Sequence, residues 1–122
     1  MPEVKFVHQG TNKILLMDFS EIVDHDLLSG LIEESIRIVR TESPGRSVLA
    51  VIDLTGTHVN KTVIASLKAL SRNNGPLIRA IAFVGLNWVW SFAASTLLRI
   101  TRRTNHRVIH RREQALQWLS EQ

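Results

Sequence analysis

Residues 47–60 read SVLAVIDLTGTHVN, and this stretch decides the fold. Its apolar residues 48–52 run without interruption into Asp53, and the turn 54–57 follows. A continuous apolar run is typical of a strand buried on both faces, because a strand with one solvated face alternates apolar and polar residues. The stretch therefore predicts an interior strand over 47–53. In open α/β sheets, ligands and partners meet the carboxyl ends of the strands, so we expect the site at 53–60.

The amino side of this strand predicts an antiparallel hairpin and a helix. Strand patterns cover 4–8 and 13–18, and the turn formers QGTN lie between them. A helical pattern then covers 21–41. We expect Asp24 to be its N-cap and Val23 to pack against its first turn as a hydrophobic staple.

The carboxyl side alternates helices with strands. The patterns predict, in order, a helix over 60–73, a strand over 77–84, a helix over 88–103, an edge strand at 108–109 and a helix over 113–120. We expect Trp118 and Leu119 to fix the last helix to the body of the domain, since a short helix is marginal alone. Strands joined by helices run parallel through right-handed crossovers. The 122 residues are thus predicted to form a single α/β domain with a mixed, mostly parallel sheet, an N-terminal antiparallel hairpin and helices on both faces.

Composition excludes several kinds of site. The chain has no cysteine, so disulfides, thiolate metal ligands and cysteine nucleophiles are excluded. Its histidines share no spacing typical of a metal site, so neither a metal nor a cofactor is expected: they are His8, His25, His58, His106 and His110. No signal-peptide pattern and no membrane-spanning apolar run is present, which suits a cytoplasmic protein.

The net charge of +4 is unevenly distributed. Residues 1–61 hold six Lys/Arg and nine Asp/Glu, a net −3, whereas residues 62–122 hold nine and two, a net +7. Six arginines and no acid lie between 99 and 112: Arg99, Arg102, Arg103, Arg107, Arg111 and Arg112. They suit either an anionic partner or a solvated rim. Trp88 and Trp90 open the predicted helix 88–103. Aromatic with basic residues suit an acyl ligand or a membrane surface, but they suit better an ordinary buried helix whose aromatic end fills the core. No base-reading module is present, so nucleic acid is disfavoured.

The residues also carry a family resemblance. VLAVIDLTGT, the amphipathic helix after it, the strand AIAFVGL and the ending REQALQWL resemble the SpoIIAA-like proteins of the STAS fold. In STAS anti-sigma-factor antagonists the turn reads Asp-Ser-Ser-Gly, and a partner anti-sigma kinase phosphorylates its second serine, which dissolves the complex. The motif falls here on Asp53-Leu54-Thr55-Gly56, with Leu54 in place of the first serine. The resemblance implies Thr55 as the phosphoacceptor.

Two functions follow as hypotheses. The first is a non-enzymatic STAS-like regulatory or sensing domain that acts through protein contact at the 53–60 turn, with an anti-sigma kinase as partner by resemblance and a homodimer left open. Its contact residues are Asp53, Leu54, Thr55, Gly56, Thr57 and His58. The alternative is a lipid- or membrane-surface-binding module that uses the 88–103 helix and the arginines. Its contact residues are Trp88, Trp90, Arg99, Arg102, Arg103 and Arg107.

Enzymatic activity is the third possibility that the turn raises. Asp53, Thr55 and His58 are the residue types of a nucleophilic site, in which a base activates the hydroxyl. However, an aspartate and a threonine at a strand end most often satisfy backbone groups of the turn. We therefore expect no catalytic residue.

Overall fold

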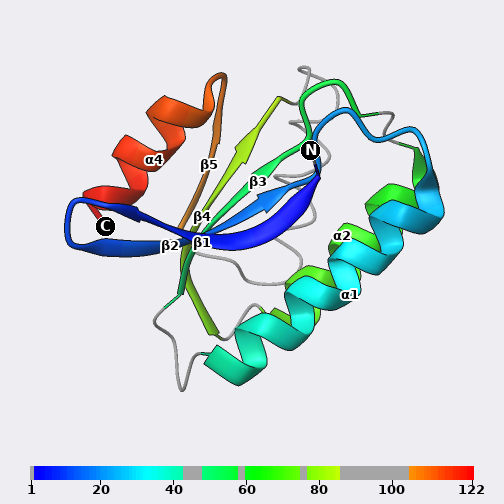
Figure 1. The fold of residues 1–122 in the computed structure, drawn as a ribbon, viewed down its shortest axis with the longest axis horizontal. Helices are drawn as coiled ribbons and strands as arrows, with labels where there is room; N and C mark the ends of the chain where they lie inside the picture. The colour runs from blue at the N-terminus through cyan, green and yellow to red at the C-terminus, as the bar shows by residue number, and fades with distance from the viewer. Residues whose placement is uncertain (1, 43–47, 58–59, 75–76, 86–104) are drawn as a thin grey trace.

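The computed structural model describes residues 2–42, 48–57, 60–74, 77–85 and 105–122 (Figure 1). Its elements are β1 (Glu3–Gln9), β2 (Asn12–Asp18), α1 (His25–Glu42), β3 (Val48–Asp53), α2 (Lys61–Asn74), β4 (Ile78–Val84), β5 (His106–Ile109) and α4 (Arg112–Ser120). Each agrees with a predicted strand or helix, with ends that differ by at most four residues. The helix expected over 88–103 lies outside the described residues.

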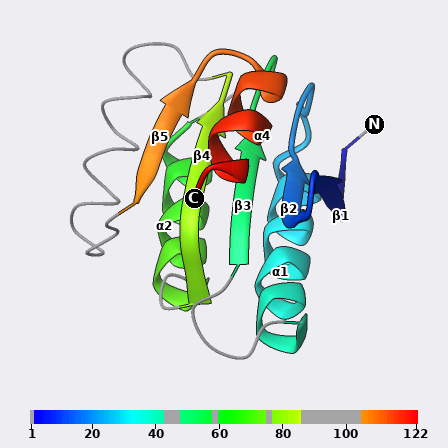
Figure 2. The same ribbon diagram turned by 90° about the vertical axis from the view of Figure 1, so that its left-hand side faces the viewer.

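The sheet has the order β1-β2-β3-β4-β5. β1 and β2 pair antiparallel, and every other neighbouring pair is parallel. β3 is the central strand and is buried along its whole length, and β5 lies at an edge, so both predictions are confirmed. Helices α1 and α2 cover one face, and α4 covers the other (Figure 2). The mixed α/β sheet with helices on both faces is therefore the observed fold.

Alternate residues of β3 belong to two different cores. Val48, Ala50 and Ile52 pack with α1 and α2, whereas Leu49 and Val51 pack with α4. Because successive side chains of a strand point to opposite faces, both sets must be apolar. The unbroken apolar run in the sequence is the consequence of these two cores.

The same alternation places two aspartates on the α4 face. Asp53 continues the series of Leu49 and Val51, and Asp18 continues the corresponding series in β2. The parallel register pairs Asp18 with Asp53. Two carboxylates therefore lie side by side at the carboxyl edge of the sheet.

Helix α1 begins at His25, four residues later than predicted. The Glu21 amide donates to the Thr55 carbonyl (2.8 Å), and the Ile22 amide donates to the Thr57 hydroxyl (3.0 Å). These bonds hold the segment before α1 against the turn that follows β3. Because the amides of this segment are bonded to the β3 turn, the segment does not adopt helical structure, and α1 starts only after it.

Asp24 is the N-cap, as predicted, but the hydrophobic staple is wrong. The Asp24 carboxylate accepts the amides of Asp26 (2.9 Å) and Leu27 (3.4 Å). Val23, the predicted staple, is 82% exposed. Because the preceding residues are bonded to the β3 turn, the chain enters α1 with Val23 directed to solvent.

Helix α4 depends on its contacts with the sheet. Ala115 and Leu119 are completely buried, Trp118 is half-buried, and the Asn12 side-chain amide donates to the Ser120 carbonyl (2.9 Å). A helix of nine residues is marginal in isolation, so these contacts keep it folded.

Replacing Leu119 with alanine should lower the free energy of unfolding by ~2–5 kcal/mol, because it leaves a cavity in the core under α4. Denaturant titration of Leu119→Ala beside Gln114→Ala, an exposed position of the same helix, measures the effect. Equal stability of the two variants would contradict this account of how α4 is held.

Candidate functional site

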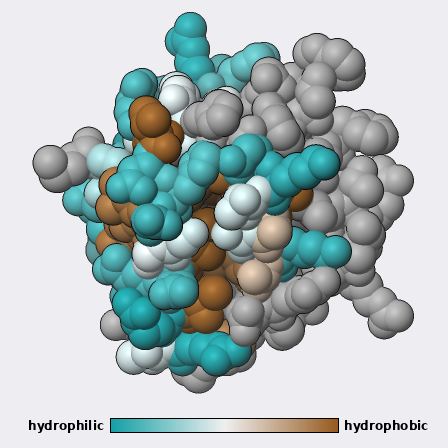
Figure 3. Space-filling view, turned by 90° about the vertical axis from the view of Figure 1, so that its right-hand side faces the viewer, coloured by the Kyte–Doolittle hydropathy of each residue, from teal (hydrophilic) through white to brown (hydrophobic). Residues whose placement is uncertain are grey.

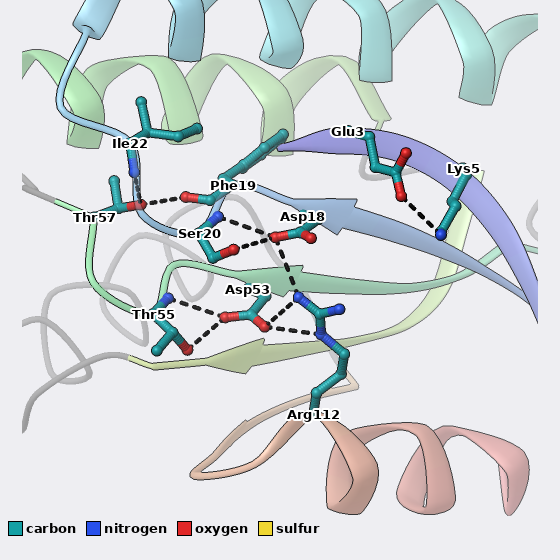
Figure 4. Close-up of polar contacts among 10 residues, drawn as sticks. All are labelled: Glu3, Lys5, Asp18, Phe19, Ser20, Ile22, Asp53, Thr55, Thr57 and Arg112. Carbon is teal, nitrogen blue, oxygen red and sulfur yellow. Dashed lines mark hydrogen bonds and ion pairs between the residues drawn. The ribbon is translucent and has the colours of Figure 1, made fainter. Parts of the chain in front are cut away.

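The ends of β2 and β3 carry the same turn. In each, the aspartate Oδ1 accepts both the amide and the hydroxyl of the residue two positions later. For Thr55 these bonds are 2.9 and 2.6 Å long (Figure 4). In each turn, the apolar residue between the aspartate and the hydroxyl residue is buried in the core under α1 and α2. The two segments are Asp18-Phe19-Ser20 and Asp53-Leu54-Thr55.

A single arginine joins the two turns. Arg112, the first residue of α4, donates from Nε to Asp53 Oδ2 (2.9 Å). Its Nη2 lies 2.8 Å from the same oxygen and 3.1 Å from Asp18 Oδ1 (Figure 4). The side chains of Asp18 and Asp53 are only 9% and 6% exposed. Burial of a charge away from water is costly when the charge has no partner. Here one guanidinium compensates two carboxylates that are almost out of water.

These contacts shift the pKa values of Asp18 and Arg112. Burial by itself would raise the pKa of Asp18, but the bonds from the Ser20 hydroxyl and amide, together with Arg112, lower that pKa below its ordinary value of 3.8. Burial would likewise lower the pKa of Arg112, and its two carboxylate partners raise that pKa above its ordinary value. Both groups are therefore charged at neutral pH.

The end of β4 closes against the Thr55 turn. The Leu54 amide donates to the Val84 carbonyl (2.9 Å), and Gly85 follows with φ of +84°. A Cβ atom at Gly85 would lie 2.4 Å from the Thr55 hydroxyl oxygen and 2.5 Å from the Thr55 amide nitrogen. Glycine is therefore required here both for its conformation and for the close approach of the two chains.

An open hollow of about 470 Å³ lies at this edge of the sheet. Its lining combines hydroxyls, carboxylates and basic groups from the strand ends and from the β5–α4 connection. The lining residues are Ser20, Glu21, Asp53, Thr55, Val84, His110, Arg111, Arg112 and Glu113. The Asp53 and Arg112 groups in its wall already bind each other. Among the described residues, no group of three His, Asp or Glu side chains is arranged to hold a metal.

The structure brings most of the predicted contact turn together at this edge. Thr55 and Gly56 are exposed, Thr57 is half-buried, and Asp53 and Leu54 are buried. The Thr57 hydroxyl donates to the Phe19 carbonyl, so this side chain ties the turn to the segment before α1. His58 lies outside the described residues.

Little of the predicted lipid-contact set falls within the described residues. Arg107 is exposed on β5, and its guanidinium lies 5.4 Å from the centre of the Trp118 ring. The others, Trp88, Trp90, Arg99, Arg102 and Arg103, lie outside the described residues. Within the described part of the chain, no helix combines the length and the apolar character needed to cross a bilayer.

Three residues of this network were not predicted from the sequence. Asp18 and Ser20 repeat the Asp-apolar-hydroxyl pattern of the β3 turn, so comparing MDFS with IDLT could have found them. Arg112 was noted only as one of six arginines. Nothing local distinguishes it from its neighbours, because its partner Asp53 is 59 positions away.

Comparison with known proteins supports the fold alone. No protein-family model and no curated protein matches this chain. The chain is similar to the solved structure of an uncharacterized DUF3478-family protein with a SpoIIAA-like fold from Shewanella loihica PV-4. The two share 15% sequence identity with a TM-score of 0.66, over 95% of this chain and 91% of the other. The domain thus has a SpoIIAA-like fold, as the sequence resemblance implied.

Gly85→Ala should destabilise the domain strongly, because the new Cβ would collide with the backbone of Thr55. Gly10→Ala is the matched control: Gly10 also has a positive φ, of +63°, but its Cβ would meet nothing within 4 Å. The control should cost about 1 kcal/mol, the conformational penalty alone, and Gly85→Ala clearly more. Similar losses of unfolding free energy would argue against a close contact between these chain segments.

The low pKa of Asp18 predicts acid sensitivity with a definite sign. The folded state binds the Asp18 proton less readily than the unfolded state does, so the stabilisation is present above pH 3.8 and is lost as pH falls through the lowered pKa. Asp18→Asn should therefore reduce the steepness with which unfolding free energy falls between about pH 5 and about pH 2. Glu33→Gln, which removes an exposed carboxylate, serves as control. Unchanged steepness in Asp18→Asn would be contrary to this prediction.

Proposed function

We propose that this domain is a cytoplasmic, non-enzymatic regulatory module that binds a protein partner through a surface we name the turn face. The turn face consists of Val23, Leu27, Thr55, Gly56 and Thr57. The observation that carries the proposal is the exposure of two large apolar side chains beside the β3 turn: Val23 is 82% exposed and Leu27 is 47% exposed.

The two parts of the turn face are held together by hydrogen bonds. The Glu21 amide binds the Thr55 carbonyl, and the Ile22 amide binds the Thr57 hydroxyl. Three residues further along each segment, the Asn60 side-chain nitrogen also lies 3.2 Å from the Nδ1 atom of the His25 ring. The apolar residues at the start of α1 and the polar turn after β3 thus form one fixed surface.

Its mixture of apolar and polar groups is typical of a surface that binds another protein. Figure 3 shows hydrophobic patches that interrupt the hydrophilic surface on the side of α1 and α2. An apolar centre surrounded by polar groups is the usual anatomy of a protein interface. A turn already fixed by hydrogen bonds also binds with a smaller loss of conformational entropy than a loose one.

The bonding of Thr55 supports a contact role over catalysis. A threonine nucleophile needs a base that is free to take its proton. The Thr55 hydroxyl donates to Asp53 Oδ1, and the other oxygen of this carboxylate binds Arg112 twice. Asp53 therefore acts as an anchor that is neutralised by an ion pair.

Thr55 is the phosphoacceptor candidate of the turn face. The residue is exposed, but its hydroxyl must leave Asp53 before it can be modified. A phosphate would add about −1.5 to −2 charges next to the Asp53 carboxylate, at the wall of the hollow. Such a charge would oppose an apolar contact at this surface.

The lipid-binding alternative has less support. Of its proposed contact residues, only Arg107 lies in the described part of the chain, and this side chain stacks on Trp118. No described feature of the α4 face favours a lipid over solvent.

The turn face predicts which substitutions abolish partner binding. The double variant Val23→Ser/Leu27→Ser removes the exposed apolar centre. The amount of partner protein that cross-links to it in the source cell should therefore be several-fold lower than for the wild-type domain. The thermal unfolding temperature of the double variant should fall only slightly, since Val23 is 82% exposed and Leu27 is 47% exposed. Gln114→Ala, on the opposite face, should retain the partner. Retention by the double variant would contradict the proposal.

Thr55→Glu and Thr55→Val separate a contact role from a purely structural one. If the turn face binds the partner, Thr55→Glu should weaken binding more than it weakens the fold, and Thr55→Val should retain more binding than Thr55→Glu. Thermal unfolding and affinity are measured for both variants. Loss of stability without a selective loss of affinity would show that Thr55 serves only the turn.

A further inference from the structure

The Asp53 carboxylate is shared between the turn after β3 and the start of α4, which meet at the carboxyl edge of the sheet. Its Oδ1 holds the Thr55 amide and hydroxyl, and its Oδ2 holds the Nε and Nη2 groups of Arg112. Thr55 belongs to the turn face, which adjoins α1, whereas Arg112 is the first residue of α4, which covers the other face of the sheet. A single side chain therefore connects the two faces (Figure 4).

The two oxygens of a carboxylate turn together about the bond to Cγ. When Thr55 holds Oδ1, it also fixes the direction in which Oδ2 presents its lone pairs to Arg112. The side chain of Asp53 is only 6% exposed, so little water is present to replace a lost partner. In such a network, the strength of one hydrogen bond depends on the others.

Helix α4 is an element on which this dependence can act. It has nine residues, so its folding depends on the sheet. The Asn12 side chain binds its last turn, Ala115 and Leu119 bury its inner side, and Arg112 holds its first turn. Loosening of Arg112 therefore acts directly on the first turn of α4.

We propose that the Thr55 turn and α4 are energetically coupled through Asp53 and Arg112. An event that draws the Thr55 hydroxyl away from Asp53 loosens the first turn of α4, and displacement of Arg112 loosens the Thr55 turn in return, because coupling between two sites is reciprocal. The coupling lies within the free domain, so it does not depend on the turn face being a partner surface.

The Ser20 turn supplies a second, weaker connection to the same arginine. Ser20 binds Asp18, but Asp18 Oδ1 lies 3.1 Å from Arg112 Nη2, against 2.8 Å for Asp53, and it receives no bond from Nε. The geometry therefore assigns the larger effect to Thr55 and a smaller one to Ser20.

Amide hydrogen exchange in the full chain tests the coupling with a double-mutant cycle. The corners are wild type, Thr55→Val, Arg112→Leu and the double variant, and the readout is exchange in α4 relative to β3. Thr55→Val should speed α4 exchange on the order of fivefold, as expected for the net loss of one hydrogen bond. In the Arg112→Leu background, the same substitution should have little further effect on α4. If Arg112→Leu does not fold, Arg112→Lys takes its place, since lysine lacks the paired donors.

The matched control is Thr57→Val. Thr57 lies in the same turn, and its hydroxyl binds Phe19 and Ile22 rather than Asp53. This variant should leave α4 exchange unchanged relative to β3. The coupling is refuted if Thr57→Val speeds α4 exchange as much as Thr55→Val does, or if the effect of Thr55→Val is the same with and without the arginine. Loss of partner binding bears only on the turn face and leaves this result untouched.

Discussion

The ion pair of Arg112 with Asp18 and Asp53 is the contact on which this edge of the domain depends. The parallel register of β2 and β3 places the two carboxylates side by side on one face of the sheet. Like charges in that position repel, and neither is well solvated, so a cation must lie between them. Because Arg112 supplies that cation and opens α4, the start of this helix is fixed by the charge requirement of two strand ends.

The sheet could be predicted from the sequence because its determinants are local. The apolar run 48–52 identified the central strand, and the turn formers between β1 and β2 identified the hairpin. The start of α1 could not be predicted, because the bonds that delay it come from Thr55 and Thr57, more than 30 positions away. Arg112 escaped prediction for the same reason: six arginines lie close together, and only the folded sheet selects one of them.

The position of Leu54 explains how this turn departs from the serine pair of STAS antagonists. Its side chain is 1% exposed and belongs to the core under α1 and α2. A serine there would place a hydroxyl among apolar groups, which is unfavourable unless it finds a partner. Phe19, at the equivalent position of the β2 turn, is buried in the same core. The departure thus strengthens packing, and it leaves Thr55 exposed and bonded to Asp53.

Close contacts around Thr55 make the turn a rigid element. Gly85 approaches its backbone from β4, and Glu21, with φ of +58°, donates its amide to the Thr55 carbonyl. A non-glycine residue at such a φ costs about 1–3 kcal/mol and persists only where the surrounding structure enforces it. The domain therefore uses part of its folding free energy to hold this turn. A turn held so firmly cannot adapt to a partner by local rearrangement, so changes there must pass to the groups that hold it, among them the buried carboxylate of Asp53.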